Sequence, residues 1–335
     1  MLNYRQKARG ILSIARILLP IISFIIPIVI LYSLDSKSFE ITWKGRTYYL
    51  FFLWLLFLET FLNWRELEHA LGKIRSLRTG AFVVSLSFPT IYVVTTSYYG
   101  LNTVIANLSG QYKIPFADWM PLSTEYLVLT VLFVLIVSLG YGIGQLMNLS
   151  ISTLFLGAIG AIYTIDNLYP YGRFTLFQII VPTTANLAMN VLNLMGYHTL
   201  WIGNPSNMPT FIAWNSQGNY SSAFSIAWPC SGVESLIIYT VTILLFLKKT
   251  PISWPVKAVY FAIGAAITYF INVLRIATIF TISINGGSIE AFHNFYGQLY
   301  SISWIMAYPL VIIGTQLLWA TIRSRRSLTR DISKD

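Results

Sequence analysis

Charged residues are scarce in this 335-residue chain. Asp, Glu, Lys and Arg make up 10% of it, whereas soluble domains carry about 25%. Hydrophobic residues make up 56%. Too few charges remain to cover a water-facing surface, which excludes an ordinary soluble enzyme and favours a polytopic membrane protein. The net charge of +10 does not indicate a nucleic-acid partner, because the basic residues stand beside apolar runs, as the positive-inside rule predicts.

Cysteine and histidine are nearly absent. The chain has one cysteine, Cys230, which excludes an intrachain disulfide framework, and three dispersed histidines without metal-ligand spacing. No Gly-rich phosphate loop follows a predicted strand. We therefore expect no metal and no nucleotide cofactor. The chain also lacks a Gly-x-Ser-x-Gly element and a pair of intramembrane aspartates, which argues against a serine or aspartic intramembrane protease.

Long apolar runs are abundant, and eight are predicted to cross a membrane as helices. The first is too long for the hydrophobic core of a signal peptide and lacks a small-residue cleavage site. Glu59, Glu125 and Asp166 fall near span ends, where a boundary position accounts for them. The predicted fold class is an all-α polytopic membrane protein with an outer-face amphipathic helix and a small extracytoplasmic loop region. The predicted spans are residues 11–32, 48–62, 81–101, 123–147, 151–168, 231–247, 256–284 and 298–322.

The basic segments predict the orientation. Basic residues gather at the N-terminus, in loops 65–78 and 248–257, and in the tail, so all four are expected in the cytoplasm. Eight membrane crossings place all four basic segments on the same side. A further crossing by residues 174–195 would put the basic loops 65–78 and 248–257 on opposite sides. Polar residues also interrupt this segment, so we expect an amphipathic helix in the outer interface or a re-entrant segment. Short strands or turns on the membrane surface are expected at residues 198–202, 210–214 and 223–228.

Cys230 and Arg275 are predicted to lie at one depth. Cys230 lies 18 positions before Lys248, and Arg275 lies 18 positions after Lys257. Each is therefore roughly 27 Å from a basic anchor, in a hydrocarbon core of about 30 Å. Their helices are consecutive and antiparallel, and His293 follows in the next outer loop. A thiol, a fixed cation and an imidazole are the parts of a thiol-based acyl-transfer site.

Cys230 is the candidate nucleophile because of its position, directly after Pro229, where we expect a helix to begin. Free backbone N–H groups and the helix dipole would favour a thiolate there. The N–H groups of Ser231 and Gly232 are candidate oxyanion donors. The alternative is that the lone cysteine is a small buried hydrophobe.

Arg275 and its neighbours are candidates for the supporting roles. An arginine about two turns inside a span is costly, so it is usually functional or paired. Arg275 could also snorkel to the interface or pair with Glu234, which lies one turn after Cys230 on the same face. The Glu234 carboxylate could instead simply favour the helix dipole. Asn272 lies three residues before Arg275 and could orient its guanidinium.

His293 is the candidate general base or acid. A loop histidine among aromatic residues is commonly structural, which is the alternative here. His69 lies beside acidic residues in a cytoplasmic loop and is expected to be solvated. His198 lies on the outer side and is a possible rival.

Three elements together resemble the exosortase/archaeosortase family of membrane-embedded, sortase-like cysteine transpeptidases. Each element alone is weak, but their order and their placement in the last three spans agree with the family. The resemblance covers about residues 174–322 and divides the chain into N-terminal helices at 1–173, a catalytic region at 174–322 and a basic cytoplasmic tail at 323–335. The elements are Pro229-Cys230-Ser231-Gly232-Val233-Glu234, Asn272-Val273-Leu274-Arg275-Ile276 and His293-Asn294-Phe295-Tyr296-Gly297.

The resemblance implies a membrane cysteine protease or transpeptidase in the cell membrane, with its active site on the extracytoplasmic face. Its substrates would be exported surface proteins whose C-terminal signal combines a short motif, a hydrophobic helix and a basic cluster. Cys230 would form a thioester, Arg275 would steady the oxyanion, and His293 would move the proton. An amine, with a membrane lipid as its possible carrier, would then accept the protein.

Three other classes of function remain open from the sequence, and one of them is another membrane acyltransferase or intramembrane protease. A multispan transporter or channel would use Arg275 to bind its ligand, but no inverted repeat or repeated polar pattern supports it. A membrane scaffold without chemistry would be insensitive to Cys230→Ser. The sequence leaves the sorting motif, the acceptor and the oligomeric state undetermined.

Overall fold

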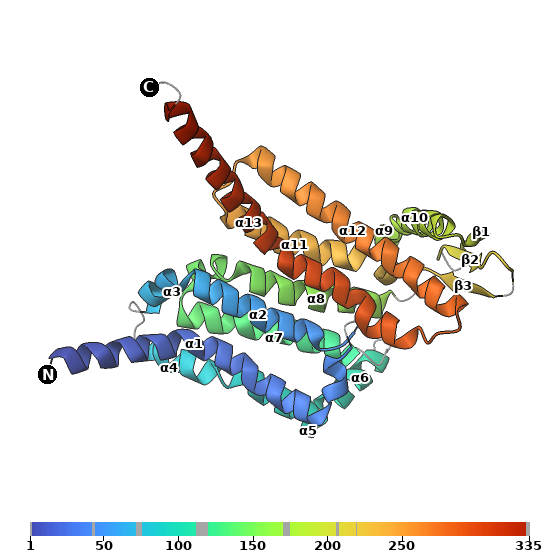
Figure 1. Cartoon of the computed structure of the whole chain (residues 1–335). Helices are drawn as coiled ribbons and strands as arrows, with labels where there is room; N and C mark the ends of the chain where they lie inside the picture. Colours follow the sequence, from blue (N-terminus) through green and yellow to red (C-terminus); the bar gives the residue numbers. More distant parts are fainter. Residues whose placement is uncertain are drawn as a thin grey trace.

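The structure is a computed structural model, and it describes residues 2–41, 44–71, 76–111, 120–169, 175–205, 208–218 and 220–332. Most of these residues are helical, and a small sheet lies at one end (Figure 1). The first helices are α1 (Leu2–Leu34), α2 (Thr47–Leu62), α3 (Trp64–Leu71), α4 (Ser76–Ser85), α5 (Phe88–Tyr98), α6 (Leu101–Gln111), α7 (Met120–Gly140) and α8 (Ser150–Leu168). The later helices are α9 (Thr175–Gln178), α10 (Val181–Leu194), α11 (Val233–Lys249), α12 (Trp254–Ile284) and α13 (Gly297–Ile332).

The predicted all-α polytopic membrane fold is confirmed. Six helical segments of the described chain are long and apolar enough to cross a membrane, namely Arg16–Leu34, Arg78–Tyr98, Met120–Gly140, Ser150–Leu168, Trp254–Ile284 and Leu299–Arg323. The remaining two predicted spans correspond to α2, with 16 residues, and α11, with 17. Both are apolar but about 25 Å long, which is short of a hydrocarbon core of about 30 Å. The count of eight crossings therefore stays a prediction.

A glycine with positive φ shifts the ends of two of the predicted spans. The fourth helix ends at Gly140 rather than at residue 147, because Gly142 (φ 101°) turns the chain into a short 3₁₀ helix, Ile143–Met147. The sixth begins at Val233 rather than at residue 231, because Gly232 (φ 96°) separates α11 from the preceding turn. Only glycine adopts such a φ without strain.

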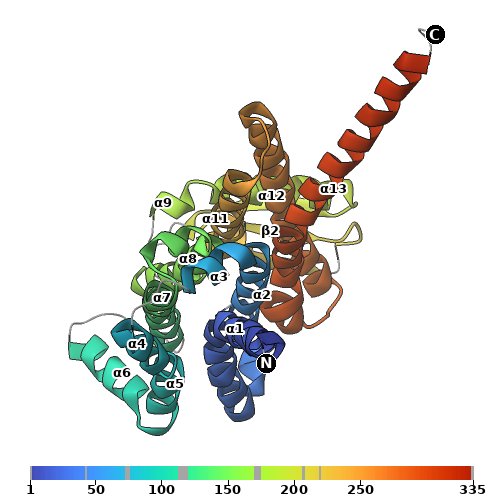
Figure 2. The ribbon, with the colours of Figure 1, turned by 90° about the vertical axis from the view of Figure 1, so that its left-hand side faces the viewer.

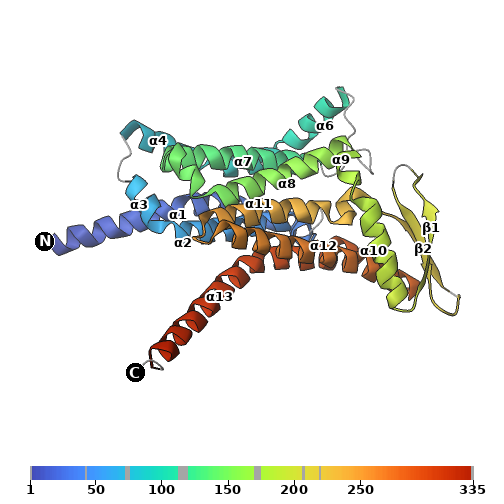
Figure 3. The ribbon, with the colours of Figure 1, turned by 90° about the horizontal axis from the view of Figure 1, so that it is seen from above.

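The basic segments gather at one end of the bundle. The start of α1, helix α3 and the end of α13 lie at this end, and the sheet and α10 lie at the opposite end (Figures 1 and 3). Figure 2 shows the N-terminal helices on one side of the bundle and α11–α13 on the other, with α8 between them. Helix α8 packs against α2 and α7 on one side and α11 on the other. This arrangement agrees with the predicted grouping of basic loops on one side.

Residues 174–195 form no long apolar helix in their described part. Helix α10 has 14 residues, about 21 Å, and runs across the end of the bundle in Figure 3. Its buried residues recur at helical spacing and face α12, β1 and β2. They are Val181, Thr184, Ala185, Ala188 and Leu192. The arrangement favours a helix at the membrane surface over a helix that crosses the membrane. The predicted domain boundary at residue 174 lies outside the described residues.

Three antiparallel strands in the order β1-β2-β3 follow α10. They are β1 (His198–Gly203), β2 (Thr210–Trp214) and β3 (Ser221–Ser225). The first two lie where the sequence predicts strands, whereas the third ends at Ser225 because residues 228–231 form a 3₁₀ turn. Phe211 of β2 stacks on Phe280 of α12 with ring centroids 4.2 Å apart, and Phe224 of β3 meets the same ring edge-on. These contacts fix the sheet onto the end of α12.

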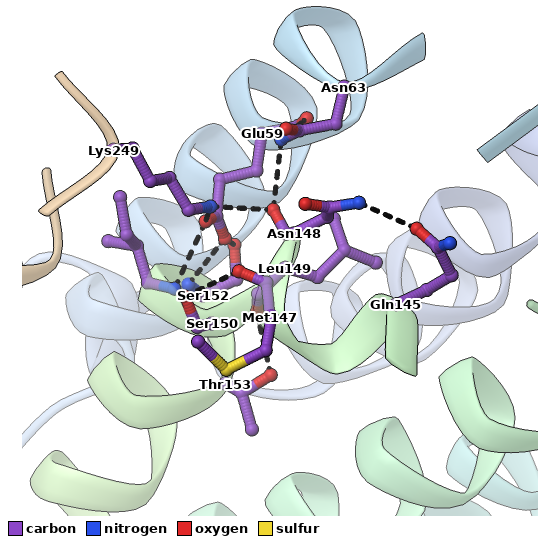
Figure 4. A network of polar contacts seen from close by, with 11 residues as sticks. Glu59, Asn63, Gln145, Met147, Asn148, Leu149, Ser150, Ser152, Thr153 and Lys249 are labelled. Atoms are coloured by element: carbon purple, nitrogen blue, oxygen red, sulfur yellow. Dashed lines mark hydrogen bonds and ion pairs between the residues drawn. The ribbon is translucent and has the colours of Figure 1, made fainter. Parts of the chain in front are cut away.

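Carboxylates that the sequence placed at membrane boundaries are instead buried and paired. Glu59 accepts hydrogen bonds from the backbone N–H groups of Ile151 (3.0 Å) and Ser152 (2.8 Å) at the start of α8, and from Lys249 Nζ at 2.6 Å (Figure 4). Glu125 of α7 accepts two hydrogen bonds from the guanidinium of Arg46, at 2.8 and 2.9 Å. Burial of a carboxylate requires such partners, and they connect helices far apart in the sequence.

Candidate active site

Cys230 lies in the 3₁₀ turn Trp228–Ser231, where its N–H donates to the carbonyl oxygen of Ala227 at 3.0 Å. The expected position at the start of an α-helix is therefore wrong by one turn. Gly232 follows in the left-handed conformation, and a Cβ added there would lie 2.9 Å from Cβ of Asn272. Glycine thus lets the Cys230 turn pack directly against α12. Ser231 is fully buried, and its hydroxyl donates to the carbonyl oxygen of Trp228 at 2.8 Å.

The structure brings Cys230 and His293 together. The Cys230 Sγ lies 3.6 Å from His293 Nε2, within hydrogen-bond range for sulfur. His293 lies in a π-helical turn, Phe292–Tyr296, that leads directly into α13, rather than in an open loop as expected. Such wide turns are rare and are frequent at functional sites. The rival His198 lies in β1 and packs against Trp214 instead.

Arg275 completes the cluster from α12. Its side chain is buried, at 4% exposure, and a terminal guanidinium nitrogen donates to the backbone carbonyl oxygen of His293 at 3.4 Å. Gly297 allows this approach, because a Cβ there would lie 2.7 Å from Arg275 Nε. The same Nε is buried and has no hydrogen-bond acceptor in the described part of the chain. A buried cation with an unused donor is poised to stabilise negative charge that forms beside it.

Neither expected neighbour of Arg275 holds its guanidinium. Asn272 is fully buried, and its amide nitrogen donates to the carbonyl oxygen of Thr268 at 3.0 Å, back along its own helix. Glu234 is also buried, and the hydroxyl of Tyr48 donates to its Oε1 at 3.2 Å. Among the described residues no ion pair joins Glu234 to Arg275. The contact of Asn272 with Gly232 shows instead that this asparagine supports the Cys230 turn.

A pocket of about 370 Å³ opens onto Cys230 and His293. It lies between the end of β3, the C-terminal part of α12 and the residues before the π-helical turn. Most of its lining is apolar, as in most small ligand pockets. The remaining lining residues are Phe224, Ser225, Ile226, Ile276, Ile279, Phe280, Ile289 and Glu290.

The protein environment disfavours a resting thiolate. Burial raises the pKa of the Cys230 thiol above its ordinary value. The positive charge of Arg275 is the largest opposing effect on that pKa, and the charges of Glu234 and Asp166 add to the rise. The thiolate expected at a helix start stays a prediction, and a general base beside the thiol would assist its formation.

The N-terminal helices also reach the site, which the motifs did not indicate. Tyr48 of α2 contacts Glu234, as described above, and Lys44 forms a buried ion pair with Asp166 of α8. Burial lowers the pKa of Lys44, and the Asp166 carboxylate opposes that shift. The sequence shows a lysine and an aspartate near the ends of two predicted spans. Hydropathy alone does not predict that these two side chains form an ion pair.

A comparison with known families identifies the family of this chain. The family model described as transmembrane exosortase matches residues 43–311, which is well over half of the chain. The match includes Cys230, Arg275 and His293, and it begins near α2, far before the motifs on which the sequence resemblance depended. No curated protein and no solved structure matches the chain. The chain is therefore a multi-pass membrane protein that belongs to the transmembrane exosortase family.

Proposed function

We propose that this protein is a membrane cysteine transpeptidase that cleaves the C-terminal sorting signal of exported surface proteins and transfers them to an amine acceptor. The observation that carries the proposal is the 3.6 Å approach of Cys230 Sγ to His293 Nε2, beside the buried cation of Arg275. The nucleophile and the base line one pocket, and the electrophilic stabiliser on α12 donates a hydrogen bond to the backbone of the base. The family membership supports the same class of reaction.

The first half-reaction forms a thioester. His293 Nε2 accepts the thiol proton of Cys230, and Sγ attacks the carbonyl carbon of the scissile peptide bond. Arg275 stabilises the oxyanion of the tetrahedral intermediate, and the backbone N–H groups of Ser231 and Gly232 are further candidate donors. The C–N bond then breaks, and His293 returns the proton to the departing amine. The products are an acyl group on Cys230 and a free hydrophobic tail.

The second half-reaction consumes the thioester. The amine of an acceptor, such as an aminated membrane lipid, attacks the thioester carbonyl, and an amide bond forms as the C–S bond breaks. His293 takes the proton from the attacking amine and gives it to the Cys230 sulfur. Water in place of the amine would give simple hydrolysis, so the apolar lining of the pocket favours transfer by limiting access of water.

The position of the site suits a substrate that is anchored by its tail. Cys230 and His293 line a pocket beside the end of β3. Figure 3 shows the sheet at the bundle end opposite the basic segments. We infer that the basic end is cytoplasmic and that the site lies at the outer membrane boundary. A substrate held by a transmembrane tail presents its cleavage site at that depth.

Processing of a tagged surface protein with a hydrophobic C-terminal tail, taken from the same genome, tests the proposal. Wild type and Cys230→Ala are co-expressed with it, and membrane levels of both enzymes are checked. Loss of the tail only with wild type is the expected result, and the mass of the released protein then shows whether a lipid is attached. Equal processing by both would remove Cys230 as the nucleophile and favour the transporter or scaffold interpretations.

A further inference from the structure

Strand β3 has a free edge that leads to the nucleophile. The sheet order β1-β2-β3 leaves β3 at the edge, with β2 on its only paired side among the described strands. The backbone of Phe224 and Ser222 pairs with β2, as the register and the flanking bonds Ile226 N–H to Pro209 and Asn215 N–H to Tyr220 require. The N–H and C=O groups of Ser221, Ala223 and Ser225 therefore point away from β2. We call these three residues the free edge of β3.

The free edge lacks the features that usually prevent strand addition. Natural edge strands are commonly blocked by charged side chains, proline or bulges. Here the three side chains are small, uncharged and exposed. No hydrogen bond found in the described part of the chain uses their backbone groups. A strand edge of this kind is a ready template for an added extended peptide.

The free edge also runs into the pocket of the proposed active site. Phe224, Ser225 and Ile226 line the pocket together with Cys230 and His293. Ala227 continues in an extended conformation (φ −85°, ψ 157°), and Cys230 follows three residues later. The distance from Ser221 to Ser225 is about 13 Å at 3.3 Å per residue, which fits about four residues of an extended peptide.

We propose that the substrate binds by adding a strand to the free edge of β3, with the residues before the scissile bond paired in parallel to β3. The proposal rests on the function proposed above. The parallel direction follows from the order of the chain, because β3 runs from N- to C-terminus toward Cys230 and the substrate residues before the scissile bond must do the same. The exported part of the substrate then lies along β3, its scissile carbonyl reaches Cys230, and its hydrophobic tail continues into the membrane. Backbone pairing gives affinity independent of side chains, so different surface proteins can share one site.

Labelling of Cys230 by peptide chloromethyl ketones tests the pairing directly. The probes are N-acetyl tetra-alanyl chloromethyl ketone and its variants with a single N-methyl group at successive residues. In the reaction the Cys230 sulfur displaces chloride and a thioether forms, so the adduct mass reports the rate at the only cysteine of the chain. Pairing predicts alternation: N-methylation slows labelling about tenfold where the N–H faces β3, and has little effect at the residues between.

Two substitutions of Ala223 give matched controls in the enzyme. The Ala223 N–H is not used by β2, so Ala223→Pro leaves the sheet bonds intact while it removes a donor from the free edge. It should slow labelling by the parent peptide about tenfold. Ala223→Thr keeps the donor and should label within about threefold of wild type, since a side chain at this edge is exposed. Iodoacetamide should label all three proteins at equal rates, which shows that the Cys230 turn is unchanged.

Each outcome decides the proposal. Alternation together with the Ala223→Pro effect supports strand addition. Labelling that is independent of N-methyl position overturns it. Cys230-dependent processing of the surface protein is measured separately. Processing without alternation would reject strand addition and support the transpeptidase function. Alternation without processing would keep the peptide site and reject the transpeptidase.

Discussion

Close packing around two glycines sets the geometry of the cluster of Cys230, Arg275 and His293. Gly232 brings the Cys230 turn against Asn272, and Gly297 brings the start of α13 against Arg275. Both contacts are too tight for a Cβ, which real structures essentially never place under 3.0 Å from another heavy atom. The glycines of the Cys-Ser-Gly and His-x-x-x-Gly elements therefore have a physical role here, because they set the distances between the nucleophile, the cation and the base.

Gly232→Ala should abolish processing and destabilise the fold. The left-handed φ of 96° costs about 1–2 kcal/mol for an L-residue, and the added Cβ also clashes with the buried Asn272. Gly196→Ala is the matched control, because Gly196 has a similar φ of 90° but open space around it. Thermal unfolding in detergent should show a larger loss for Gly232→Ala. Equal losses for the two variants would contradict the packing role.

The alkylation of Cys230 should depend on pH with a midpoint above that of a free cysteine. Burial raises the pKa of the thiol, so less thiolate is present at neutral pH, and the Arg275 cation works against the rise. Arg275→Gln should therefore move the midpoint still higher. Arg323→Gln removes an exposed cation near the other end of α13 and should leave it unchanged. The iodoacetamide rate is measured from pH 6 to about pH 11. A midpoint at or below that of free cysteine would refute this account.

At the scale of elements, buried polar contacts connect helices that hydropathy treats as separate. Glu59 of α2 meets the start of α8 and Lys249 at the end of α11 (Figure 4). The carboxylate satisfies two backbone N–H groups that have no partner within their own helix. Lys249 also donates to the carbonyl oxygen of Asn148 at 2.7 Å. The basic end of the bundle is thus held by one shared carboxylate.

Glu59→Ala should lower thermal stability more than Lys249→Ala. The first change leaves two buried N–H groups and the Ser152 hydroxyl without their acceptor, at about 1–3 kcal/mol per buried group. It also removes one of the two acceptors of the Lys249 ammonium. The second removes a partly exposed cation, whose contribution solvent screening reduces. Unfolding of the purified variants in the same detergent gives the comparison. A larger loss for Lys249→Ala would show that the ion pair, rather than the cap, dominates.

At the scale of the whole molecule, the bundle separates a basic end from an end that carries the sheet and the proposed active site. The end of α13 and the start of α1 lie at the basic end, while the sheet and α10 lie at the other (Figure 3). The pocket is lined by residues of β3 and of the C-terminal part of α12. The sheet and α10 both pack against α12. These contacts restrict motion of the sheet and α10 relative to the bundle. The proposed catalytic residues are thereby held at one end of the bundle.

Cysteine accessibility in cells tests the proposed orientation, in which the basic end lies in the cytoplasm and the sheet lies outside. Cys230→Ala removes the only cysteine, so a single new cysteine can be placed at either end. Ser216→Cys, exposed between β2 and β3, should react with a membrane-impermeant maleimide in intact cells or spheroplasts. Ser253→Cys, exposed before α12, should react only after the membrane is opened. The reverse pattern would invert the proposed topology.

The sequence alone determined the class of fold, the approximate spans and the residues of the cluster. Hydrophobic runs of membrane length depend only on local composition, and equal spacing of Cys230 and Arg275 from basic anchors depends only on helix rise. The tertiary structure decided the rest. The pairing of Glu59 with Lys249, the π-helical turn at His293, the pKa of Cys230 and the free edge of β3 all arise from contacts between segments far apart in the chain. Such contacts follow from packing and burial, which no local pattern of residues encodes.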